Sequence, residues 1–109
     1  MSIQLPDPIA RYVQIANSDT PEAVPACFAP DAIVHDEGRT YEGVAAIENW
    51  MAATKKKYGH TVAPLELAAR DGQSVLKARL TGNFPGSPIT VNFSFVLADG
   101  KIHSLEIGS

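Results

Sequence analysis

The sequence has one cysteine, few aromatic residues and no long apolar segment. The single Cys27 excludes an internal disulfide, and its apolar neighbours predict a small buried side chain. No segment approaches the length of a membrane span, and the first residues lack the basic and apolar regions of a signal peptide. We therefore expect a reduced, cytoplasmic protein that does not contact a membrane.

Positive charge is also scarce, since nine Lys and Arg residues stand against twelve Asp and Glu, for a formal net charge of −3. Phosphate binding needs a basic surface, so nucleic acid is not expected as a partner. The three lysines at positions 55–57 fall at the end of a predicted helix, where cations complement the negative end of the helix dipole. They predict a solvated helix end.

Apolar residues, by contrast, are present in the proportion that a globular domain needs. The chain has 109 residues, of which 45% are hydrophobic. A chain of this length buries roughly two thirds of its unfolded surface, which is enough to close one core without a metal or a disulfide. No repeat, linker or long charge run divides the chain, so residues 1–109 are expected to form a single domain.

The first half of the chain has the apolar spacing and the boundaries of helices. Asp7 and Pro8 are typical of a helix start, and apolar residues follow them at helical spacing. A short second helix is expected to end near residues 28–30. The third and longest helix is expected to open at Gly43 and to stop at Gly59.

Strands dominate the remainder of the sequence. A small hairpin is expected around the turn at residues 37–39. Period-two alternation then predicts four antiparallel strands in a meander, at residues 61–70, 74–83, 89–98 and 101–107. Helices first and strands last indicate an α+β fold, in which three helices from the N-terminal half cover one face of a curved sheet.

Several local strings accompany this order of elements: Arg11-Tyr12-Val13 with Asn17, Phe28-Ala29-Pro30-Asp31-Ala32 into Val34-His35-Asp36, Tyr41-Glu42-Gly43 with Ala46-Ile47, and Gly100-Lys101-Ile102. Together they resemble the nuclear transport factor 2-like superfamily, especially its SnoaL-like and ketosteroid-isomerase-like members. The resemblance covers nearly the whole chain. It implies a cone-shaped domain with a mixed sheet of about six strands and an enclosed, mostly apolar pocket, but it leaves the function open because this scaffold hosts many activities.

The resemblance makes Asp36 and Tyr12 candidate catalytic residues. In ketosteroid isomerases, the position that matches Asp36 holds the carboxylate that moves a proton between carbons, and a shielded carboxylate suits that task. The position that matches Tyr12 holds a tyrosine that donates a hydrogen bond to the developing oxyanion. The alternatives are that Asp36 caps the turn beside it and that Tyr12 packs in the core.

Asn92 matches the second oxyanion donor of those isomerases, where the family has a protonated aspartic acid. An amide also donates a hydrogen bond, although a weaker one. Alternation along the strand opposes this role, because Phe93 and Phe95 mark the other face as the core side. Both assignments hold only if the two phenylalanines cover a second apolar surface, such as a homodimer interface on the sheet face.

Two aromatic residues, Phe28 and Trp50, are our candidates for the wall of the pocket. The three histidines and one cysteine have no metal-ligand spacing, so no metal is expected. The glycine- and proline-containing stretch at residues 82–88 is expected to link two strands at the edge of the pocket, not to bind a cofactor.

Two functions agree with these observations. The first is a cofactor-free isomerase or cyclase that binds a small apolar carbonyl compound, with Asp36 as general base and Tyr12, helped by Asn92, stabilising the enolate. The second is a non-catalytic module of the same fold that binds a ligand or dimerises. Convergence of the three side chains on one cavity would favour the enzyme.

Overall fold

A computed structural model describes residues 4–18 and 20–108 of the chain. The helical segments are α1 (Asp7–Ser18), the short 3-10 turn η1 (Pro21–Ala23), α2 (Val24–Cys27) and α3 (Val44–Tyr58). The strands are β1 (Phe28–Asp36), β2 (Arg39–Glu42), β3 (Thr61–Arg70), β4 (Gln73–Thr81), β5 (Ile89–Ala98) and β6 (Lys101–Gly108). The expected sequence of helices and strands is therefore confirmed.

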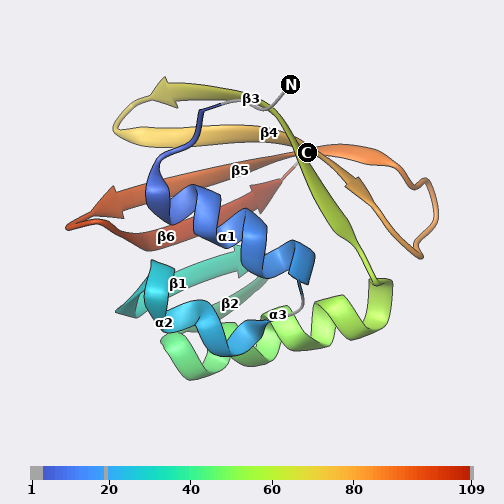
Figure 1. Cartoon of the computed structure of the whole chain (residues 1–109), viewed down its shortest axis with the longest axis horizontal. Coiled ribbons are helices and arrows are strands. Elements are labelled where there is room, and N and C mark those ends of the chain that lie inside the picture. Colours follow the sequence, from blue (N-terminus) through green and yellow to red (C-terminus); the bar gives the residue numbers. More distant parts are fainter. Residues whose placement is uncertain (1–3, 19, 109) are drawn as a thin grey trace.

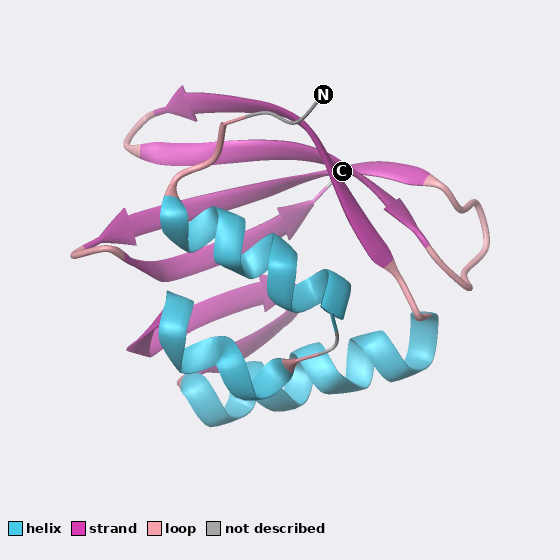
Figure 2. Ribbon diagram, viewed as in Figure 1, coloured by secondary structure: helices cyan, strands magenta, loops and turns pink. Residues whose placement is uncertain are grey.

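All six strands form one mixed sheet in the order β2-β1-β6-β5-β4-β3. Every neighbouring pair is antiparallel except β1 and β6, which run parallel. The last four strands form the predicted meander. Figure 1 shows the three α-helices on one face of this curved sheet, with α1 crossing in front of it and α3 running along one side. The same layering is visible by element type in Figure 2, and it confirms the α+β cone.

Three tight turns set the strand registers. Asp71-Gly72 and Asp99-Gly100 have φ angles of 50° and 77°, and of 53° and 74°, and Glu37-Gly38 has 53° and 76°. Positive φ at both central residues is the mark of a type I′ turn, whose twist matches the twist of the flanking strands. The turn positions expected from the sequence are confirmed, because this turn type depends on local residue chemistry.

One helix boundary was predicted too late in the chain. Helix α2 stops at Cys27, and Phe28 already belongs to β1, where it pairs with Ile102 of β6. The Phe28 ring is buried against that of Tyr12, with centroids 6.1 Å apart. Sheet pairing and burial of this ring therefore outweigh the local helical pattern.

The core lies between the helices and the inner face of the sheet. Cys27 is fully buried in it, as expected for a small apolar side chain. The Asn17 side chain connects helix α1 to the start of β3. It donates a hydrogen bond to the carbonyl oxygen of Val62 (3.0 Å) and accepts one from the Val62 amide (2.7 Å). Among residues 4–18 and 20–108, no helix is long and apolar enough to cross a membrane.

Candidate active site

A cavity of about 340 Å³ opens between the helices and the inner face of the sheet. At about 30 Å³ per liquid water molecule, this space holds one small molecule. Side chains from α1, the end of β1, one side of α3, and β4 to β6 line it, and most of them are apolar. The polar ones are Tyr12, Thr20, Asp36, Glu37, Trp50, Thr54, Lys55, Tyr58 and His60.

Asp36 lies at the end of β1 with its side chain at the cavity. The Trp50 indole Nε1 of α3 donates a hydrogen bond to Asp36 Oδ2 at 3.1 Å. Burial raises the pKa of the Asp36 carboxyl, the Trp50 hydrogen bond opposes this rise, and the neighbouring Glu37 carboxylate adds to it. The Trp50 hydrogen bond to Oδ2 therefore orients the carboxylate, and the raised pKa makes it a stronger base than an exposed aspartate.

Tyr12 reaches the same cavity from α1. Its ring is almost fully buried, at 3% exposure, among three phenylalanine rings whose centroids lie 5.6 to 6.1 Å away. Burial raises the pKa of the Tyr12 hydroxyl, and the charge of Asp36 raises it further. This hydroxyl takes part in none of the side-chain hydrogen bonds found within residues 4–18 and 20–108, and its oxygen is not one of the fully buried unpaired atoms there. It is thus a protonated donor at a cavity that also holds a carboxylate.

Asn92 does not join these two residues, which corrects the expectation of a second oxyanion donor. Val91 and Phe93 face the cavity, so Asn92 points to the outer face of β5. Phe93 and Phe95 are buried inside the domain. The condition under which Asn92 would face the pocket, an outer surface covered by these two rings, is therefore wrong.

The two candidate wall residues have different positions. Trp50 lines the cavity, and its indole also packs against the Tyr41 ring with centroids 5.8 Å apart. Phe28 does not reach the cavity; it lies behind Tyr12 in the core, which corrects its assignment to the wall. The reason is the early start of β1, which turns Phe28 toward α1.

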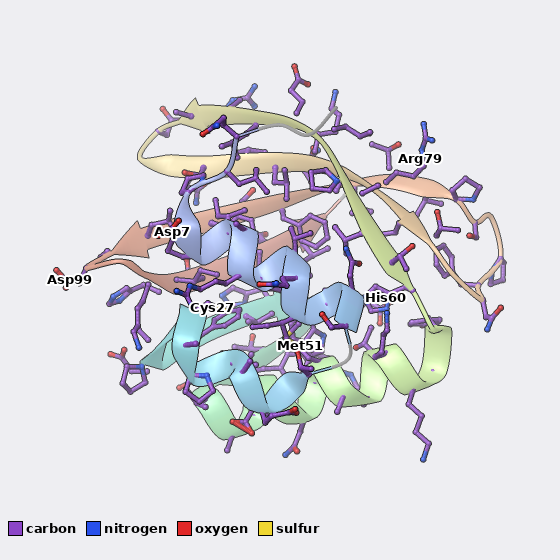
Figure 3. All side chains as sticks on the ribbon, in the orientation of Figure 1. Asp7, Cys27, Met51, His60, Arg79 and Asp99 are labelled. Carbon is purple, nitrogen blue, oxygen red and sulfur yellow. The ribbon has the colours of Figure 1, made fainter. Side chains whose placement is uncertain are left out.

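Lys55 and His60 line the cavity, although the sequence analysis assigned neither to it. The three lysines do occupy the last turn of α3, as expected. Lys55, however, is only partly exposed, and its Nζ donates to the carbonyl oxygen of His60. Figure 3 shows His60 beside the C-terminal end of α3 and Met51 further back along the same helix. The signal for Lys55 was present in the helical period, since it follows Met51 by four residues.

The loop at residues 82–88 borders the cavity through Phe84, whose ring meets that of Tyr58 edge-on at 5.7 Å. The position expected for this loop is confirmed. For the described part of the chain, no three His, Cys, Asp or Glu side chains gather closely enough to hold a metal ion.

Comparison with known proteins relates this chain to one protein family. Residues 9–105 match the family model described as the SnoaL-like domain. A Sinorhizobium meliloti protein that carries the provisional name polyketide cyclase has 40% sequence identity, with 94% of each chain covered and a TM-score of 0.89. No curated protein matches the chain significantly.

Two more distant structures share the fold. A Catenulispora acidiphila protein with a ketosteroid isomerase-like fold has 18% identity, covers 97% of this chain and 87% of its own, and gives a TM-score of 0.84. An Agrobacterium tumefaciens protein, provisionally an isomerase of the SnoaL-like family, has 16% identity, coverages of 93% and 92%, and a TM-score of 0.77.

Proposed function

The chain belongs to the SnoaL-like family, and we propose that it is an isomerase or cyclase that moves a proton next to the carbonyl group of a small apolar compound. The observation that carries this proposal is the hydrogen bond from Trp50 to Asp36 at the wall of a cavity that Tyr12 also lines. A base and an oxyanion donor on one cavity are the two groups that enolisation requires.

The proposed reaction starts when Asp36 takes a proton from a carbon beside the carbonyl. The electron pair of the broken C–H bond moves into an enolate, and the Tyr12 hydroxyl donates a hydrogen bond to the enolate oxygen. In an isomerisation, Asp36 returns the proton to a different carbon. In a cyclisation, the enolate carbon attacks a second carbonyl, and the new alkoxide takes the proton from Asp36. Both reactions balance with the side chains alone.

The mostly apolar wall favours this chemistry for two reasons. It selects an apolar substrate, and it excludes water that would stabilise the Asp36 carboxylate and weaken it as a base. The provisional names of the relatives from Sinorhizobium meliloti and Agrobacterium tumefaciens agree with the proposed class of reaction.

Deuterium exchange into 2-tetralone tests the proposal, because the C1–H bonds of this ketone lie between a carbonyl and an aromatic ring. We expect the protein to accelerate exchange in D₂O, and Asp36→Asn to lower the enzymatic rate by about 10²–10⁴-fold. Ketone affinity, measured in parallel, should change little. The control is Asp31→Asn, which removes the same charge from an exposed position of the same strand and should keep the rate.

Two outcomes would contradict the proposal. If Asp36→Asn exchanges as fast as the wild type, Asp36 is not the base. If the wild type binds 2-tetralone without accelerating exchange, the protein is a binding module of the same fold.

We also propose that two copies associate through the outer face of the sheet. Ile33, Val75 and Val96 are partly exposed there, on strands β1, β4 and β5. Ser104 lies between Ile33 and Val96, and Ser94 is the partner of Val75. Apolar side chains on an otherwise polar face are a feature of homodimer contacts. The molar mass in solution is the test, and a monomer at micromolar concentration would refute the dimer.

A further inference from the structure

The cavity has a second polar region, separate from Asp36 and Trp50. Lys55 and His60 form it near the C-terminal end of α3. Lys55 follows Trp50 by five residues, so the two backbone positions are about 7.5 Å apart along the helix axis. The lining also includes the apolar side chains of Met51 and Phe93.

Among residues 4–18 and 20–108, no carboxylate lies within salt-bridge distance of the Lys55 ammonium group. The one salt bridge found in residues 4–18 and 20–108 joins Lys77 to Glu66 on the sheet. Lys55 donates one hydrogen bond to the carbonyl oxygen of His60, and no other described residue accepts from its two remaining N–H donors. A cation at an apolar wall attracts an anion strongly, because little water screens it there.

The His60 imidazole also has one nitrogen with no hydrogen-bond partner among the described residues. Its Nδ1 is the single buried side-chain nitrogen or oxygen in the described residues that forms no hydrogen bond. Burial lowers the pKa of His60, and the charge of Lys55 lowers it further, so the ring is neutral at physiological pH. A neutral imidazole leaves the Lys55 charge in place and can donate one N–H hydrogen bond to an anion.

We propose that the natural ligand carries a carboxylate at the end opposite its reacting carbonyl, and that Lys55, assisted by His60, binds this carboxylate. The inference rests on the proposed function for the carbonyl end and adds the substrate class. The ligand is then an apolar ring compound of about two fused rings in length, with oxygen groups at both ends. A specificity contact of this kind fixes which end of the molecule meets Asp36.

A matched pair of ketones tests the proposal: 6-carboxy-2-tetralone and 6-methyl-2-tetralone, which differ only in the group far from the carbonyl. The wild type should bind the acid about tenfold more tightly, which corresponds to about 1.4 kcal/mol, because the acid accepts a charged hydrogen bond that the methyl compound cannot. Lys55→Met should lose this preference while its affinity for the methyl compound, which also reports a folded site, stays the same. Lys55→Arg, which keeps the charge, should retain it.

The control is Lys56→Met, which changes the net charge equally at an exposed position outside the cavity and should keep the preference. Equal affinity of the wild type for the two ketones, or a preference that survives in Lys55→Met, would overturn the inference. A loss of equal size in Lys56→Met would also overturn it, because the effect would then come from net charge.

The same ketones separate this inference from the proposed function. Asp36→Asn should keep the preference for the acid, because Lys55 sets it, and should lose deuterium exchange. Exchange that depends on Asp36 without a preference for the acid leaves the proposed function standing and refutes the carboxylate site. A preference for the acid without exchange supports the carboxylate site and refutes the proposed function.

Discussion

Replacing Tyr12 by phenylalanine should separate catalysis from stability. The change removes only the hydroxyl, and the ring keeps its contacts with three phenylalanines at 5.6 to 6.1 Å. None of the side-chain hydrogen bonds of the described residues involves that hydroxyl, so its loss leaves none of their groups without a partner. We expect the free energy of unfolding in urea to change by less than about 0.5 kcal/mol.

The exchange rate should respond very differently. The loss of one oxyanion donor costs about 10²–10³-fold in rate, so deuterium exchange into 2-tetralone should fall by that factor in Tyr12→Phe. The control is Tyr58→Phe, which deletes the same atom from another residue of the cavity wall, one that meets Phe84 edge-on. That variant should exchange at the wild-type rate.

Two results would refute this reasoning. If Tyr12→Phe keeps a rate within about threefold of the wild type, the hydroxyl does not contact the enolate. If Tyr58→Phe loses as much rate as Tyr12→Phe, the effect belongs to the polarity of the cavity in general and not to a positioned donor.

Three further changes have expected outcomes. In Trp50→Phe the hydrogen bond that lowers the pKa of Asp36 is lost, so the acidic limb of the exchange-rate profile should move to higher pH; a shift to lower pH would contradict the assigned role. In Asn17→Ala the two hydrogen bonds to Val62 (3.0 and 2.7 Å) are lost, which should cost about 2 kcal/mol in urea unfolding, and a cost below about 0.5 kcal/mol would be inconsistent with them. In Gly82→Ala the new Cβ would lie 2.8 Å from the carbonyl oxygen of Tyr58, the last residue of α3. The free energy of unfolding should therefore fall by about 1–3 kcal/mol. An unchanged thermal midpoint would contradict this clash.

Local signals were sufficient for most of the fold. The Asp-Gly turns at Asp71 and Asp99, and the glycine stop at Gly59, each depend on backbone conformations that few residues adopt easily. The alternation of β5 was equally informative, since it marked Phe93 as inward and Asn92 as outward. The role that the family resemblance implied for Asn92 was wrong because burying the aromatic face stabilises the domain far more than one amide would.

The sequence by itself determined the helices, the meander and the α+β class, because each depends on the residue type or on a period that neighbours along the chain set. Only the tertiary structure decided which side chains meet. Trp50 reaches Asp36 from another element, Phe28 turns into the core, and Lys55 enters the cavity from a lysine run that, as a pattern, indicates only a helix end. Whether these side chains meet depends on how α1 and α3 cross the curved sheet. The packing of the whole core sets that crossing, so no single segment of the sequence predicts it.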